Sequence, residues 1–299
     1  MRLAYLVSFP VTVLVCAATW GAPATPPAGS TVTAVQSPAW LVQAHAVKPL
    51  APGARLAGGD QLRTGSGGRV YIALPEHSTV KMGESTELAM PAMQMMHDNQ
   101  GGMFKASLRI LTGVFRFTTS LIGKTEHRQV DIRVGVATIG IRGTDVWGRA
   151  GGNGDLVALL EGKAEMHVPG HAMMMMDQPM HYMMMPKNGG MEMNVPITQA
   201  KLADWAAQTD VHTGDGVLQT GGRWVVALIS SADERITAHL MQELASAGYP
   251  SADIRIMKEG RAWHRLEIHQ VASYRDAHAL AKRLGKAYPL TSPQVFRTH

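Results

Sequence analysis

Short runs of alternating hydrophobic and polar residues fill the chain from Thr31 to Val168. Examples are "RVYIALP", "STVKM", "GVFRFTTS" and "VDIRVG", and turns that contain glycine separate them. Successive side chains of a strand point to opposite faces, so Val70, Ile72 and Leu74 are expected to share a core-facing side. The pattern predicts a mainly β domain over residues 31–168.

Residues 169–196 differ in composition, because ten of the twenty methionines lie there. Two histidines, His171 and His181, accompany them. Methionines can fill irregular core space or form an adaptable contact surface, and this is the favoured interpretation. Thioethers and imidazoles also suit Cu(I), so copper binding is the alternative. The methionines are Met173–Met176, Met180, Met183–Met185, Met191 and Met193.

Residues 197–222 are expected to hold a short helix followed by a linker. Ile197, Leu202 and Trp205 have helical spacing and predict one apolar side of the helix. The segment "VHTGDGVLQTGG" after it is rich in turn-forming residues, which favours a linker over about 209–222.

The pattern changes again in residues 223–299. "RWVVALISS" predicts a strand, and the helix after it carries Ile236, Leu240 and Leu244 at helical spacing. Two strands, "ADIRIMK" and "AWHRLEIHQV", follow and are joined by a turn at Glu259 and Gly260. A second helix capped by Ser273 and a last strand complete the order β-α-β-β-α-β, which is an α+β unit of the ferredoxin-like type.

The N-terminus predicts export. Arg2 precedes an apolar stretch from Leu3 to about Ala18, and small residues and prolines follow it. This is the pattern of a cleaved signal peptide, residues 1–24, with cleavage after Ala24 or, as second choice, Ala22. We therefore expect a periplasmic protein without a transmembrane anchor. The single cysteine, Cys16, lies inside this signal and is either a residue of its apolar core or a site of lipidation.

Composition narrows the possible functions. The net charge of +5 is mild, and the basic residues do not cluster, so nucleic acid is not an expected partner. The chain carries no G-x-S-x-G or H-E-x-x-H motif. We expect no enzymatic activity, no cofactor and no dedicated metal site.

The stretch "GVATIGIRGTDVWGR" (135–149) has two glycines five residues apart. A phosphate-binding loop needs Lys and then Ser or Thr directly after the second glycine, but Ile141 and Arg142 stand there. A structural turn is the favoured interpretation, in which Gly140 and Gly143 supply unusual backbone angles and Asp145 bonds nearby amides to hold the turn.

Two parts of the chain resemble known families. "PGARLAGGDQLRTGSGGRVYIALPEHSTVKMGESTEL" and "ATIGIRGTDVWGR" followed by "DLVALLEGKAEM" are similar to a FecR domain. That family includes regulators that pass a signal to a sigma factor, and the resemblance implies a module that binds a ligand or a partner. "WVVALISSADERITAHLMQELASAGY" and "WHRLEIHQVASYRDAHALAKRL" resemble the SPOR domain over residues 223–297. This second resemblance implies binding to peptidoglycan glycan strands that have lost their stem peptides.

Strand alternation selects the candidate binding residues of the SPOR-like domain. Trp263, Arg265, Glu267 and His269 are expected on the open face of the sheet, with Arg255 beside them. An indole ring can cover a sugar face, while the charged groups bond hydroxyls and amides.

Val225, Ala227 and Ile229 are expected on the same open face, and an apolar patch there would suit a protein interface instead. The main hypothesis is thus an exported, non-enzymatic peptidoglycan-binding protein. The alternative is a periplasmic scaffold or signalling component whose sheet binds protein, and the third is a copper-binding protein.

Overall fold

The computed structural model of this chain describes residues 29–44, 46–98, 101–119, 127–141, 143–289 and 291–298. The predicted signal peptide, Cys16 and Arg142 lie outside these residues.

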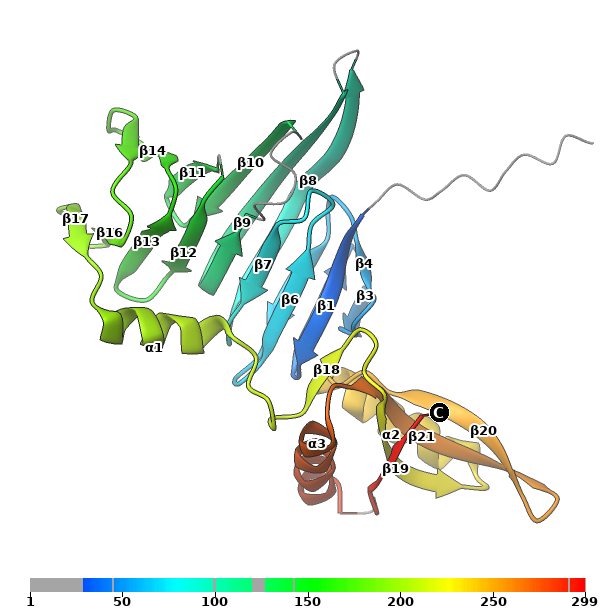
Figure 1. Cartoon of the computed structure of the whole chain (residues 1–299). Helices are drawn as coiled ribbons and strands as arrows, with labels where there is room; N and C mark the ends of the chain where they lie inside the picture. The colour runs from blue at the N-terminus through cyan, green and yellow to red at the C-terminus, as the bar shows by residue number, and fades with distance from the viewer. Residues whose placement is uncertain are drawn as a thin grey trace, which may run out of the picture.

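Two β sheets form the N-terminal lobe (Figure 1). The first sheet runs, in spatial order, through β17 (Glu192–Pro196), β16 (His181–Pro186), β13 (Gly154–Glu161), β12 (Asp145–Ala150), β9 (Gly101–Thr118), β7 (Thr79–Met82), β6 (Arg69–Ala73), β1 (Ser30–Gln36) and β18 (Val217–Gln219). The second sheet runs through β3 (Ala46–Pro49), β2 (Ala39–Gln43), β5 (Gln61–Thr64), β8 (Glu87–Asp98), β9, β10 (His127–Val134), β11 (Ala137–Ile141), β14 (Ala164–His167) and β15 (Met174–Met176). The two-residue strand β4 (Arg55–Leu56) pairs with β1. The predicted mainly β fold is confirmed.

Strand β9 belongs to both sheets. Its first part pairs with β8 and β10, and its last part pairs with β7 and β12. Gly113 lies between the two parts with φ +91°, and a Cβ there would come within 2.4 Å of the Thr86 Cα. The strand passes from one sheet to the other at a position that only glycine fills without strain.

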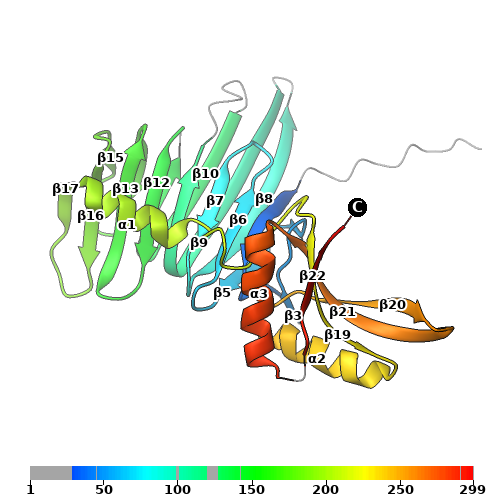
Figure 2. The same ribbon diagram turned by 60° about the horizontal axis from the view of Figure 1, so that its bottom comes forward.

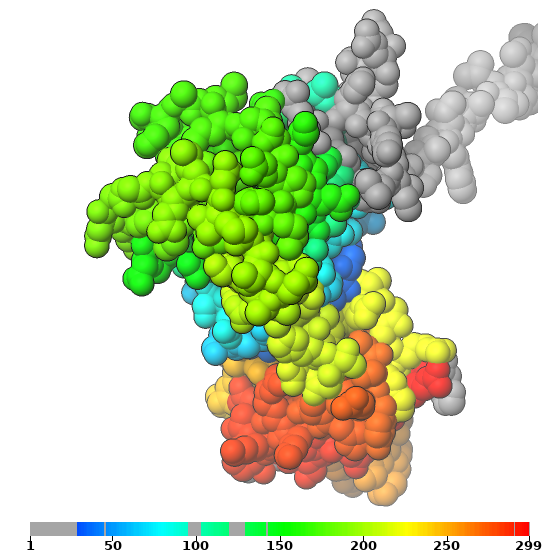
Figure 3. Space-filling view, turned by 60° about the vertical axis from the view of Figure 1, so that its left-hand side comes forward, coloured from blue at the N-terminus to red at the C-terminus, as the bar shows by residue number. Residues whose placement is uncertain are grey.

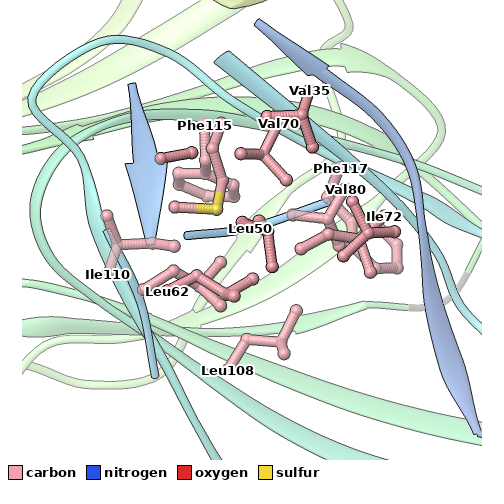
Figure 4. Packing of buried hydrophobic residues seen from close by; sticks show 14 of the residues in the cluster. Val35, Leu50, Leu62, Val70, Ile72, Val80, Leu108, Ile110, Phe115 and Phe117 are labelled. Atoms are coloured by element: carbon pink, nitrogen blue, oxygen red, sulfur yellow. The ribbon is translucent and has the colours of Figure 1, made fainter. Parts of the chain in front are cut away.

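The space between the two sheets holds the main hydrophobic core. Val70 and Ile72 have no exposed surface and Leu74 has 3%, so the predicted alternation is confirmed. Phe115 and Phe117 of β9 are also fully buried, and they pack among aliphatic side chains from both sheets (Figure 4).

The methionine-rich segment forms the end of this lobe. Met176, Met183 and Met185 lie at 4–8% exposure and join the core, whereas Met173 and Met175 are exposed at 70% and 57%. Alternate methionines therefore fill core space, as the packing interpretation expects.

Helix α1 (Gln199–Thr209) docks against the first sheet (Figure 2). Thr198 caps its N-terminus by accepting a hydrogen bond from the Lys201 N–H. The predicted apolar residue Trp205 is buried against Trp147 and Tyr182.

The C-terminal lobe has the predicted order of elements: β19 (Trp224–Ser231), α2 (Glu234–Ser246), β20 (Ala252–Lys258), β21 (Arg261–Val271), α3 (Tyr274–Ala287) and β22 (Gln294–Arg297). The strands pair antiparallel in the order β20-β21-β19-β22. Both helices pack on one face of this sheet through Leu240, Leu244, Leu280 and Leu284. Ile236, predicted on the inner side of α2, is 47% exposed instead. Assignment of this lobe to the SPOR family stays a prediction.

The segment predicted as a linker connects the two lobes firmly. It contains β18, which pairs with β1 and also contacts β21 through Leu218 and Val271. The buried carboxylate of Asp276 accepts hydrogen bonds from the backbone N–H groups of Gly214 (2.7 Å) and Val217 (3.1 Å). The two lobes, seen in the space-filling view of Figure 3, are therefore joined by strand pairing and buried hydrogen bonds. None of the helices among the described residues has the length and apolarity to cross a membrane.

Candidate functional site

A two-residue turn sets the geometry of the candidate site. Glu259 and Gly260 both have positive φ, 53° and 75°, and Lys258 pairs directly with Arg261. Partners of an antiparallel pair share a face, so Ile256 lies beside Trp263 and Ile254 lies beside Arg265. The isoleucines of β20 therefore face the open side, where Arg255 was expected.

Arg255 takes the opposite face and is separated from the other predicted site residues. It pairs with His264, whose Nδ1 lies 2.9 Å from the Asp253 carboxylate. That carboxylate in turn accepts a hydrogen bond from Thr237 of α2. Arg255 is thus on the helix side of the sheet, and its predicted place beside Trp263 is corrected.

A bulge in β19 changes a second predicted position. Ala227 pairs with Glu267 on the open face, but the register shifts before Ile229, which pairs with Leu266 on the helix face. A bulge adds one residue to one strand and so reverses the side on which the next residues lie. Val225 and Ala227 remain on the open face, where they pair with Phe296 and Gln294 of β22.

The open face is hollowed into a trough of about 410 Å³. Its lining is mixed: Ile256 of β20 is partly exposed, Ala227 and Leu228 expose almost no surface, and Trp263 and Arg265 line it from β21. Lys258, Ser230, Ser292, Gln294 and the bulged region at Ile229 complete the lining. Two of the predicted site residues, Trp263 and Arg265, therefore border an accessible hollow.

Two cationic side chains at the trough lie over aromatic rings. The Lys258 ammonium lies over the Trp263 ring, 5.3 Å from its centroid, and the Arg265 guanidinium lies over the Phe296 ring at 5.2 Å. Arg265 also pairs through Nε with the carboxylate of Glu267. The other oxygen of Glu267 lies 2.8 Å from His269 Nε2.

Glu267 differs most from its predicted role. Its side chain is only 3% exposed, and both carboxylate oxygens have partners. His269 is 41% exposed but faces a smaller hollow near Pro52 and Pro250. Sequence alternation placed both residues on the correct face, but it could not show that the carboxylate is enclosed there.

Gly143 and Thr144 lie directly before β12, where the chain passes from β11 of the second sheet into the first sheet. Gly143 has φ +79°, whereas Gly140 lies within β11 and has no unusual angle. Asp145 forms a two-point ion pair with Arg116, at 2.9 and 2.6 Å. That hydrogen bonding to Asp145 raises the pKa of Arg116 above its ordinary value. These contacts give Asp145 a structural role, but its partner is the Arg116 guanidinium and not the backbone amides predicted from the sequence.

The described residues hold no group of three or more His, Cys, Asp or Glu side chains placed to bind an ion. Copper binding by thioethers is not tested by that observation and stays a prediction.

Comparison with known proteins gives one family match. Residues 60–165 match the family model described as FecR protein, which supports the FecR domain predicted in this region. A search of the curated proteins finds no match.

Solved structures similar to this chain include two of a protein assigned as an anti-sigma factor from Parabacteroides distasonis. They have 13% and 12% sequence identity and TM-scores of 0.40 and 0.39. Each comparison covers 80% of this chain and 99% of the other. Scores this low do not carry a conclusion about fold or function.

Proposed function

We propose that this protein is a non-enzymatic binding component of the bacterial cell envelope, located in the periplasm, that recognises a protein partner. The FecR match of residues 60–165 supports a role in partner binding or signalling. The predicted signal peptide supports export. The trough on the C-terminal sheet is the proposed contact surface.

The observation that carries the proposal is the composition of the trough. Its lining is mixed, because Ile256 and the Trp263 ring lie among hydroxyl, amide and cationic groups. Aromatic and apolar groups within a polar rim are typical of a protein interface. Glu267, one of the groups expected to bond a sugar, is enclosed, and Lys258 lies over the Trp263 ring on which a sugar would stack. Arg255 lies on the other face of the sheet.

The second candidate is attachment to peptidoglycan glycan strands. It is favoured by the position of Trp263 and Arg265 at an uncovered hollow and by the SPOR-like order of elements. A glycan would have to displace Lys258 before a sugar ring could stack on that side of the indole.

Co-sedimentation of the full-length exported protein with purified, protein-free sacculi separates the two. If the partner is a protein, amidase treatment of the sacculi should not increase the amount of this protein that sediments with them. Amidase-dependent retention that Trp263→Ala abolishes would overturn the proposal in favour of glycan binding. Trp224→Phe, which changes a tryptophan outside the trough, is the matched control.

A further inference from the structure

We propose that the trough selects an extended acidic segment of a partner protein, with one carboxylate for Lys258, one for Arg265 and an aliphatic side chain between them. This inference rests on the proposed function and specifies the chemistry of the partner.

The charge of the trough gives the first argument. Among the described residues that line it, the charged side chains are Lys258 and Arg265, and both are cations. No carboxylate in the described part of the chain pairs with Lys258. A ligand that buries these cations without bringing negative charge would lose their hydration without compensation, so an anionic ligand is favoured.

Arg265 has spare donors even though it is paired with Glu267. The recorded bond to Glu267 uses Nε, and a guanidinium carries five N–H donors in a planar fork. Its side chain is 31% exposed and borders the trough. A carboxylate from a partner would therefore join an existing ion pair rather than replace it.

The side chains give the placement of the two cations. The Lys258 ammonium of β20 lies over the Trp263 ring, and the Arg265 guanidinium lies over the Phe296 ring of β22. Since β20 and β22 are the two edges of this sheet, an extended segment that crosses the trough from β20 towards β22 can bring one carboxylate to each cation.

The pair formed by Ile256 and Trp263 fits an aliphatic side chain. The two residues lie opposite each other on β20 and β21, and both side chains are partly exposed. A valine or leucine between the two carboxylates would bury its surface against this pair and gain about 25 cal/mol for each Å² removed from water. At the β22 end, the hydroxyl and amide groups of Ser230, Ser292 and Gln294 are placed to bond a peptide backbone.

The test measures binding of a fluorescent peptide, Gly-Glu-Thr-Val-Thr-Glu-Gly, to the full-length exported protein by anisotropy. The comparison peptide has glutamine in place of both glutamates. We expect the glutamate peptide to bind at least about tenfold more tightly, and the difference to shrink as salt is raised. Lys258→Glu should remove most of this preference, whereas Lys282→Glu, the same charge change on exposed α3 surface, should leave it unchanged.

Equal binding of the two peptides, or a preference that survives Lys258→Glu, would overturn the inference. That failure can be told apart from failure of the proposed function. If a protein still contacts the trough while both peptides bind alike, only the acidic specificity is wrong. If bare glycan competes with the peptide for the trough, the protein partner itself is wrong.

Discussion

Trp147 and Trp205 stack face to face, with ring centroids 4.5 Å apart and 2° between the ring planes. Trp147 also donates a hydrogen bond from its indole nitrogen to the Trp205 carbonyl oxygen, at 3.1 Å. One residue comes from β12 and the other from α1, so this contact holds the helix against the first sheet. The edge of Tyr182 meets Trp205 from β16 and completes the cluster.

Replacing Trp205 by alanine should lower the free energy of unfolding by about 3–5 kcal/mol, because it removes a buried aromatic side chain and leaves a cavity. Trp205→Phe keeps an apolar ring at the site and should lose less. Chemical denaturation of both variants measures the difference. A loss below about 1 kcal/mol for Trp205→Ala would show that α1 is held by other contacts.

Asp276→Ala should loosen the junction between the two lobes. It removes the acceptor for the N–H groups of Gly214 and Val217, and hydrogen bonds to charged groups contribute about 1.5–3 kcal/mol. Hydrogen exchange at residues 214–217 should become faster, and stability should fall. The matched control is Asp215→Ala, because Asp215 is a half-exposed carboxylate of the same segment and should change stability by less than about 0.5 kcal/mol. Unchanged exchange in Asp276→Ala would contradict the account of the junction.

Tyr71 should titrate at unusually high pH. Burial raises the pKa of its phenol to about 12, and the neighbouring Asp210 carboxylate adds to the shift. The folded state therefore holds this proton more tightly than the unfolded state, whose pKa is about 10. The stabilisation is fully present below pH 10 and is lost as pH rises from about 10 to 12.

Ultraviolet absorbance of the phenolate during an alkaline titration measures this. Tyr71→Phe should remove the step of highest pKa and flatten the loss of stability between pH 10 and 12. If the variant retains a step near pH 12 and the same alkaline stability profile, the high pKa belongs to another tyrosine.

The methionine-rich segment should oxidise selectively. Met173, Met175 and Met193 expose 56–70% of their surface, whereas Met176, Met183 and Met185 are buried. Hydrogen peroxide should therefore convert the first three to sulfoxides much faster in the folded protein. Peptide mass spectrometry gives the extent at each site, and denatured protein is the control. Similar rates for both groups in folded protein would mean that the end of the lobe opens readily.

Local patterns predicted the helices α1, α2 and α3, the four strands of the C-terminal lobe and several strands of the N-terminal lobe. Alternation gave the core face of β6, and periodicity with a serine cap gave α3 with Ala277, Leu280 and Leu284 buried. The strand in the predicted linker was missed, because "VHTGDGVLQTGG" contains glycines typical of loops. Its pairing with β1 and β21 depends on residues far away in the sequence.

The site was predicted in part. Alternation along β21 placed Trp263 and Arg265 on the open face, but Arg255 was assigned without using the register. The predicted two-residue turn at Glu259 and Gly260 would have paired Ile256 with Trp263, so that signal was present in the sequence. No sequence pattern predicts the bulge near Ile229, because it arises in the pairing of β19 with β21.

Photo-cross-linking in the native envelope tests the central claim most directly. A benzophenone amino acid at position 256, inside the trough, should cross-link the exported protein to a protein segment that mass spectrometry identifies as acidic, and Lys258→Glu should suppress the adduct. The same probe at position 236, which is exposed on the helix side, should not give that adduct. An adduct at position 256 that consists of glycan, or an equal protein adduct at position 236, would contradict the account.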